Sequence, residues 1–224
     1  CAEAALARGM PQERVHLGGF LLKPSFYPAP DESAAKLDPG PGIRETLLGA
    51  NVEGPVVLLG TGANGANNHQ AILRSLKKLQ RPITVIALCG RNQAVLSALQ
   101  DYQCPPHRLL PLGYREDMHA LLQAVDLAFI RPGTGSTSEC IRSRCPILLN
   151  GIGGVMPQER ITIRYLRSLG LQPDTVRRPG RFAPAVEQLL FQKESESTLA
   201  AQQQAFAKVN PGLTPAKIVA EILA

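Results

Sequence analysis

The chain has 224 residues, of which 44% are hydrophobic, and this length allows one well-filled domain with some additional segments. No stretch approaches the ~18–20 consecutive apolar residues that cross a bilayer. The net charge of +6 suits an anionic ligand or surface, whereas scattered basic residues, 4% aromatic residues and the lack of Trp disfavour a nucleic-acid partner.

Residues 1–45 are predicted to be an interdomain segment and linker that precede a domain over residues 46–224. The chain starts at Cys1 and shows no signal-peptide pattern, so we expect a cut or processed chain. A helix end is followed by a strand-like piece over residues 15–22. The proline-rich stretch 24–41 is typical of a linker or an ordered surface crossing.

A regular alternation of strands and helices begins near residue 54. The predicted strands cover residues 55–60, 83–89, 108–112, 127–130 and 146–149. The predicted helices cover residues 43–50, 67–79, 93–101, 117–125, 137–144 and 157–169, with three helical pieces after residue 184. Strands that are apolar on both faces and alternate with helices indicate an α/β fold, a Rossmann-like parallel sheet with helices on both faces.

The loops that follow the strands are the candidate sites, because ligands of such sheets bind beyond the carboxyl ends of the strands. In the first loop, residues 60–66, Gly60, Gly62 and Gly65 fit the spacing GxGxxG and allow a phosphate to approach a helix N-terminus. The strand 83–89 does not end in the acidic residue that would bind a dinucleotide ribose, which argues against simple NAD binding.

The second loop, residues 131–139, follows a buried strand and opens a helix. Its hydroxyl groups and backbone N–H groups suit a diphosphate. Glu139 lies three residues after Ser136, which is also the spacing of a capping box, so a purely structural role at the helix start is the alternative.

The third loop, residues 150–159, is glycine-rich and ends in Pro157, which can begin a helix. Gln158 and Glu159 together offer donors and acceptors for sugar hydroxyls. The alternative is a flexible loop with an acidic residue placed favourably at a helix start.

No metal site is predicted. The five cysteines are scattered without a CxxC pair, which favours small buried thiols in a reducing cytosol. None of the four histidines is expected to be a catalytic base, and His69, on the helix after the glycine loop, is expected to be structural or to face solvent.

Together these motifs resemble the family of UDP-sugar glycosyltransferases that contains the peptidoglycan N-acetylglucosaminyltransferase and the monogalactosyl- and glucosyl-diacylglycerol synthases. The resemblance extends over about residues 15–169 and includes the glycine-and-proline segment 15–24, the sequence CGRN at 89–92 and the stretch 112–118. It implies a glycosyltransferase B fold, of which this chain is the second, donor-binding half.

The resemblance also implies roles for individual residues. Tyr114 is expected to stack on uracil, the backbone at Arg115 to pair with the base edge, and Glu139 to accept hydrogen bonds from the ribose hydroxyls. Pro157 replaces a glycine of the family motif, which leaves the donor sugar open. The residues expected to bind substrate are Gly62, Asn64, Gly65, Arg91, Tyr114, Arg115, Met118, Arg131, Gly133, Thr134, Gly135, Ser136, Glu139, Gln158 and Glu159.

The expected function is transfer of a hexose or N-acetylhexosamine from a UDP-sugar to a lipid-linked or small acceptor, without a cofactor. The general base is expected in an N-terminal domain outside this chain, so the chain alone is expected to be inactive. A lipid acceptor implies a cytoplasmic protein in peripheral contact with the inner face of an anionic membrane. The alternatives are a UDP-N-acetylglucosamine 2-epimerase-like isomerase and a non-catalytic nucleotide-binding module.

Overall fold

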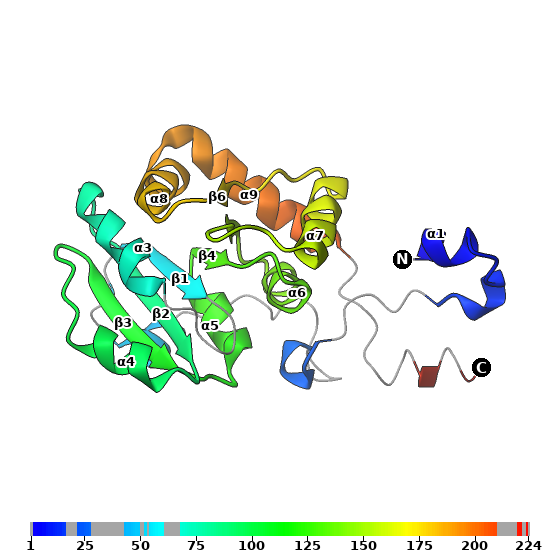
Figure 1. Ribbon diagram of the computed structural model, residues 1–224, viewed down its shortest axis with the longest axis horizontal. Helices are drawn as coiled ribbons and strands as arrows, with labels where there is room; N and C mark the ends of the chain where they lie inside the picture. The colour runs from blue at the N-terminus through cyan, green and yellow to red at the C-terminus, as the bar shows by residue number, and fades with distance from the viewer. Residues whose placement is uncertain are drawn as a thin grey trace.

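The computed structural model describes residues 2–16, 22–27, 43–49, 52, 54–60, 68–209, 219–220 and 223. Its centre is a parallel sheet with the strand order β3-β2-β1-β4-β5-β6 (Figure 1). The strands are β1 (Val56–Gly60), β2 (Thr84–Gly90), β3 (Arg108–Gly113), β4 (Leu127–Ile130), β5 (Ile147–Asn150) and β6 (Thr175–Val176). The Rossmann-like sheet expected from the sequence is thus confirmed.

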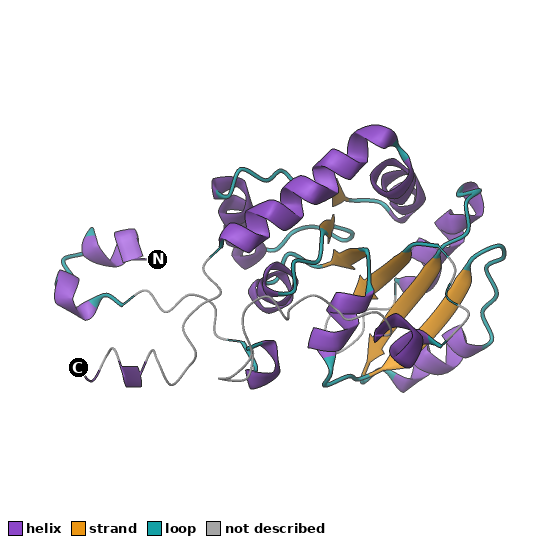
Figure 2. Cartoon of the chain, turned by 180° about the vertical axis from the view of Figure 1, so that it is seen from behind, coloured by secondary structure: helices purple, strands orange, loops and turns teal. Residues whose placement is uncertain are grey.

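Helices precede, separate and follow the strands (Figure 2). They are α1 (Ala2–Leu6), α2 (Ile43–Leu48), α3 (His69–Ser75), α4 (Gln93–Gln100), α5 (Met118–Ala124), α6 (Thr134–Arg142), α7 (Pro157–Ser168), α8 (Phe182–Phe191) and α9 (Lys193–Lys208). Short 3-10 helices are η1 (Gln12–Arg14), η2 (Pro24–Phe26), η4 (Leu76–Lys78) and η5 (Pro179–Arg181).

Strand residues alternate between two cores, because successive side chains of a strand point to opposite faces of the sheet. Leu58 and Ile130 face a core built with α2, α5, α6, α7 and α9. Leu59 and Phe129 face a second core built with α3, α4 and α8. Both sheet faces are therefore covered, and the exposed parts of the sheet are the strand ends.

The strand order reverses between β1 and β4, which lie side by side with Val57 paired to Leu127. The connections from β1 run toward β2 and β3, and those from β4 run toward β5 and β6. At such a switch point the loops after the two strands diverge and leave a crevice beyond the carboxyl ends. The fold therefore places its ligand crevice between the ends of β1 and β4.

Three differences from the predicted elements affect the site. Helix α6 begins at Thr134, about one turn earlier than predicted, and β6 was not predicted at all. Residues 17–21 of the strand-like piece 15–22 lie outside the described residues, and the flanking residues 15, 16 and 22 are not in a strand.

Part of the N-terminal segment belongs to the body of the domain. Phe26 of η2 is fully buried, and Leu48 of α2 is 5% exposed, both in the core that covers α5 and α6. Helix α1, in contrast, has no buried residue and lies away from the sheet in both views (Figures 1 and 2). The boundary between residues 45 and 46 remains a prediction. Helix η2 lies before this boundary and α2 crosses it, and both contribute side chains to the core.

Within the described part of the chain, no helix combines the length and the apolarity needed to cross a membrane.

Candidate functional site

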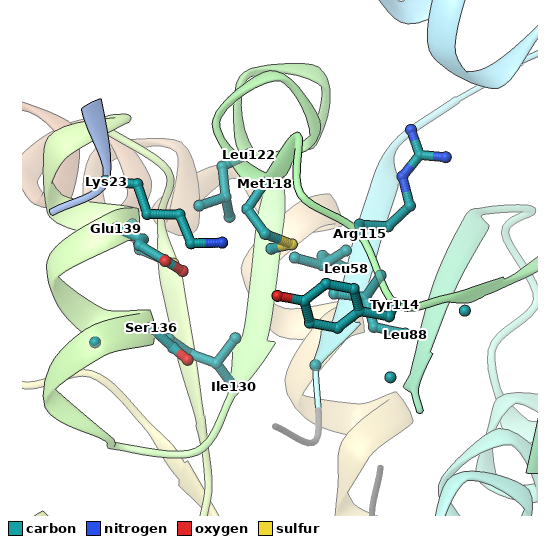
Figure 3. Close-up of a pocket in the computed structure, with 15 residues that line it drawn as sticks. Lys23, Leu58, Leu88, Tyr114, Arg115, Met118, Leu122, Ile130, Ser136 and Glu139 are labelled. Carbon is teal, nitrogen blue, oxygen red and sulfur yellow. The ribbon is translucent and has the colours of Figure 1, made fainter. Parts of the chain in front are cut away.

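A cavity of about 290 Å³ opens at the carboxyl ends of the central strands, where the switch point predicts a ligand crevice (Figure 3). Its wall is mostly apolar, with a few polar groups at one side, as is usual for small-molecule sites. The lining residues are Lys23, Leu58, Gly60, Leu88, Gly90, Gly113, Tyr114, Arg115, Met118, Leu122, Ile130, Gly135, Ser136, Glu139 and Cys140.

The start of helix α6 forms one side of the cavity. Gly133 is the N-cap, and the first backbone hydrogen bond runs from Thr137 N to Gly133 O at 3.0 Å. The N–H groups of Thr134, Gly135 and Ser136 therefore have no acceptor within the helix and add to the positive end of its dipole. Such a helix start binds anions such as a phosphate.

The capping-box alternative for Ser136 and Glu139 is wrong. Because α6 begins at Thr134, Ser136 lies inside the first turn and Glu139 lies in the body of the helix. The N-cap Gly133 has no side chain, and no side-chain hydrogen bond caps this helix. Glu139 is thus free of the structural role that the spacing suggested, and it lines the cavity.

No contact inside the protein requires a glycine at position 133 or 135. A Cβ built on either residue meets no atom within 4 Å, and neither has a positive φ. Gly60, in contrast, is close-packed, because a Cβ there would come within 3.2 Å of Ile130 Cγ2. The glycines at the start of α6 therefore leave open space beside the helix N-terminus, which is the place where a phosphate would approach.

Substitution of Gly135 by Ala separates ligand binding from folding. Stability is expected to stay equal or rise by up to about 1 kcal/mol, because Ala is the better helix residue. With a diphosphate at this helix start, as the sequence motifs predict, UDP affinity is expected to fall by about 1–3 kcal/mol, since the methyl group enters the space beside the helix. Urea unfolding and calorimetric titration with UDP measure the two effects on the same sample. Unchanged UDP affinity would contradict a diphosphate at this helix start.

Lys23 reaches the cavity from the N-terminal segment, because that segment is anchored just beyond it. The Phe26 ring is buried edge-on against His119 with centroids 5.4 Å apart. Arg142 Nε donates to Phe26 O at 2.7 Å, and its guanidinium lies 5.7 Å from the Tyr27 ring centroid. Residues 22–27 thus form a strap across α5 and α6 that carries Lys23 to the edge of the cavity.

Glu139 and Lys23 form the charged side of the cavity (Figure 3). Burial raises the pKa of the Glu139 carboxyl, and the nearby Lys23 ammonium opposes this rise. The carboxylate can accept hydrogen bonds from ligand hydroxyls, and the ammonium offers a positive charge to an anion. Glu139 lies about one helical turn after the free N–H groups at the start of α6, so a hydrogen-bond acceptor and these donors belong to one helix.

Tyr114 lies at the opposite side of the cavity, after the carboxyl end of β3, and the residue is 43% exposed. The guanidinium carbon of Arg91 lies 4.7 Å from the ring centroid and holds the ring through a cation–π contact. Arg91 itself does not line the cavity. An exposed aromatic ring, fixed in this way, is a surface on which a base can stack.

Arg115 and Met118 also line the cavity. The guanidinium of Arg115 points away from it in Figure 3 and pairs with Asp117, with Arg115 Nε 2.7 Å from Asp117 Oδ1. This pairing lowers the pKa of Asp117. The part of Arg115 that remains for a ligand is therefore its backbone, while Met118 contributes an apolar surface.

Arg131 and Glu159 are brought together, but not into this cavity. Arg131 Nε donates to Glu159 Oε1 at 3.0 Å, and Arg131 Nη2 lies 2.7 Å from Glu159 Oε2. Two further donations, to Ile152 O and Gly154 O at 2.8 Å each, occupy most of the five N–H groups of the guanidinium. Arg131 therefore holds the glycine loop 151–154 against the end of β4.

Glu159 itself is only 5% exposed and also accepts from Met156 N at 2.8 Å, at the start of α7. The expectation that Glu159 faces a sugar is not met in this arrangement, because the carboxylate is buried and bonded within the protein. The alternative, an acidic residue at a helix start, describes it better. Gln158 is exposed beside it, with Nε2 3.3 Å from Met156 Sδ, and does not line the cavity.

The expected site residues and the lining of the cavity overlap only in part. Gly62, Asn64 and Gly65 of the first glycine loop lie outside the described residues. Sequence reasoning missed Lys23, because it lies in a segment taken for a linker. It also missed the apolar wall, because residues such as Leu58, Leu88 and Ile130 have the same pattern as any buried strand residue. The remaining residues that it missed in the lining are Gly90, Gly113, Leu122 and Cys140.

His69 and four of the cysteines are buried within the described part of the chain. His69 is buried with Nε2 3.0 Å from Leu88 O, a structural position as expected. Cys89, Cys104, Cys140 and Cys145 are free and buried, which confirms the interpretation as small core thiols for these four. Among the described residues, no group of at least three His, Cys, Asp or Glu side chains is arranged to hold a metal ion.

The strand order and the crevice define a Rossmann-like domain, and the superposition on solved structures identifies its fold as glycosyltransferase B. MurG of Acinetobacter baumannii superposes with a TM-score of 0.54 at 17% identity, over 80% of this chain and 50% of that one. HepE of Anabaena, in complex with UDP-glucose, superposes with a TM-score of 0.58 at 15% identity, over 99% of this chain and 60% of that one.

Sequence similarity leads to glycolipid synthases. A probable chloroplastic monogalactosyldiacylglycerol synthase 2 of Oryza sativa subsp. japonica is 28% identical over 160 residues, 66% of this chain and 31% of that protein. A processive diacylglycerol beta-glucosyltransferase of Bacillus pumilus is 28% identical over 95 residues, 42% of this chain and 25% of that protein. No protein-family profile matches the chain.

These relatives are glycosyltransferases, and the similarity to UDP-sugar glycosyltransferases of the glycosyltransferase B fold, expected from the motifs, is confirmed. The match to the rice synthase covers 66% of this chain. It spans only about a third of the length of that synthase.

Proposed function

We propose that this chain is the donor-binding part of a UDP-sugar-dependent glycosyltransferase. The observation that carries the proposal is the cavity at the β1–β4 switch point, which combines a stacking ring, a half-buried carboxylate and a free helix start. Uracil stacks on Tyr114, the ribose hydroxyls donate to Glu139, and the diphosphate lies at the start of α6. The synthase relatives support a transferase in preference to an epimerase.

Charge placement suggests how the site would assist the reaction. When the glycosidic bond to UDP breaks, negative charge grows on the departing diphosphate. The N–H groups of Gly135 and Ser136 and the Lys23 ammonium are positive groups that are fixed before the reaction, so they stabilise that charge without reorganisation. We assign no cofactor to this step. The general base and the acceptor site belong to a part of the protein outside this chain.

A lipid acceptor is the acceptor class that the relatives favour. One is named a monogalactosyldiacylglycerol synthase and the other a processive diacylglycerol beta-glucosyltransferase. A hexose or N-acetylhexosamine is the expected donor sugar. On this proposal the protein works in peripheral contact with an anionic membrane, and the isolated chain binds UDP-sugar without turnover.

Replacement of Glu139 by Ala tests the assignment of the ribose site. UDP affinity is expected to fall by about 1–3 kcal/mol, because the ribose hydroxyls lose their acceptor. Stability is expected to change little, since no intramolecular hydrogen bond of Glu139 caps the helix. The measurement is calorimetric titration with UDP, and Glu187→Ala on α8, a partly exposed carboxylate outside the cavity, is the control. Equal affinities of the two variants would contradict the proposal.

The pH dependence of uridine binding gives an independent readout of the same carboxylate. Uridine is the ligand of choice because it carries no phosphate that titrates. Ribose hydroxyls donate to the ionised form of Glu139, so affinity is full above its raised pKa and falls as the pH is lowered through it. The fall should begin at a higher pH than for an ordinary glutamate, and Glu139→Gln should abolish it.

A further inference from the structure

A second hollow lies at the far edge of the sheet and shares no lining residue with the first cavity. It has a volume of about 560 Å³ and runs between β6, the edge strand, and the first turns of α8. We call it the β6–α8 groove. Its lining residues are Asp174, Thr175, Val176, Arg177, Arg178, Arg181, Pro184, Ala185 and Gln188.

Three arginines dominate the charge of this groove, Arg177, Arg178 and Arg181, and all three are exposed. Asp174 is the one acidic residue in the lining. No ion pair or side-chain hydrogen bond is recorded for the three guanidinium groups in the described part of the chain. Their positive charges repel one another, and within the lining only Asp174 offsets them.

A short turn separates two of these arginines. Arg178 precedes the 3-10 helix η5 and Arg181 ends it, with Arg181 N donating to Arg178 O at 3.0 Å. Pro179 and Gly180 form the turn between them. Arg178 has an extended backbone and Arg181 a helical one. Both line the groove next to Arg177 at the end of β6.

The position of Arg181 is unfavourable for the protein on its own. Arg181 is the N-cap residue of α8, and no acidic residue lies in the first turn of that helix. A cation at the positive end of a helix dipole is disfavoured, and an acidic or small polar residue is the usual occupant. An anion bound in the groove would reverse the sign of this interaction and relieve the repulsion among the arginines.

Recognition in the groove must come from the guanidinium groups rather than from the helix start. The N–H of Phe182 already donates to Pro179 O, the N–H of Ala183 donates to Ser75 Oγ at 3.3 Å, and Pro184 has no N–H. Guanidinium groups bind phosphate oxygens in pairs of parallel hydrogen bonds. We propose that the β6–α8 groove is a second anion site, which takes a phosphate monoester group.

The test compares two triple variants that remove the same charge. The groove variant is R177Q/R178Q/R181Q, and the control is R160Q/R164Q/R167Q, three exposed arginines on α7 outside the groove. Glycerol 3-phosphate is titrated against each by calorimetry, and phosphatidylcholine vesicles with and without phosphatidic acid are tested by cosedimentation. The soluble arm reports a free phosphate ligand, and the vesicle arm reports a lipid headgroup.

The groove variant is expected to bind about tenfold more weakly than the unmodified protein in at least one arm, while the control changes less than about twofold. Asp174→Asn, which removes the only acidic group of the lining, is expected to tighten binding about twofold without loss of fold. Equal losses in the two triple variants would reduce the effect to net charge and overturn the proposal. Binding in neither arm would overturn it as well.

Discussion

The Phe26→Ala variant is expected to lose about 3–5 kcal/mol of unfolding free energy, the cost of deleting a buried aromatic ring. Phe26 is fully buried, with a relative accessibility of 0%. It lies in the core that α5 and α6 share with the sheet. For a chain of 224 residues this corresponds to a fall in melting temperature of roughly 6–20 °C.

A second consequence for the cavity follows from the same ring. The strap 22–27 places Lys23 at the cavity only while Phe26 is anchored, so UDP affinity of the folded variant should also decrease. Urea unfolding with and without UDP measures both quantities. Lys23→Met is the matched comparison, expected to weaken UDP binding while leaving stability nearly unchanged, because Lys23 is exposed.

Tyr114→Ala supplies the opposite control. The residue Tyr114 is 43% exposed, so stability should change little. Loss of its stacking surface should reduce UDP affinity by about 1–3 kcal/mol. A stability loss below about 1 kcal/mol for Phe26→Ala would mean that the strap is not docked as described. Lys23 would then have no fixed position at the cavity.

The Glu159→Ala variant is expected to be destabilised by about 3 kcal/mol, toward the lower end of the range for breaking a buried ion pair. The lower end applies because the Arg131 side chain keeps 24% exposure, while that of Glu159 has 6%. Removal of Glu159 leaves the Arg131 guanidinium without its partner and removes the acceptor of Met156 N. The glycine loop 151–154 should become less ordered, since Arg131 binds its carbonyl groups.

A double-mutant cycle with Arg131→Leu and Glu159→Leu measures the coupling by urea unfolding. The double variant is expected to be more stable than the sum of the single losses predicts, because neither charge is left alone. Gln158→Ala is the neighbouring control, exposed and expected to keep full stability. If Glu159→Ala lowered UDP-sugar affinity without destabilising the protein, the direct sugar contact expected from the sequence would be restored and the structural role contradicted.

The fold class and the edge of the sheet that carries the cavity follow from the sequence pattern. Apolar runs such as residues 56–60 and 127–130, separated by helical segments, indicate a parallel sheet with both faces covered. Once the strands are parallel, their carboxyl ends lie at one edge of the sheet, so the loops that follow the strands lie at that edge. Tyr114 and Glu139 were identified there by the resemblance of their motifs to the glycosyltransferase family, and both line the cavity.

Tertiary contacts were needed to establish which of the motif residues line the cavity. The spacing of Ser136 and Glu139 fits a capping box equally well, and the start of α6 at Thr134 removes that reading. Glu159 and Arg131 lie 28 residues apart in the chain, so their pairing was invisible to any local pattern. Lys23 reaches the cavity because Phe26 is anchored against residues of α5 and α6. These partners lie more than ninety residues after Phe26 in the chain. Local propensity acts over a few residues, whereas burial and ion pairing depend on contacts that exist only after the chain has folded.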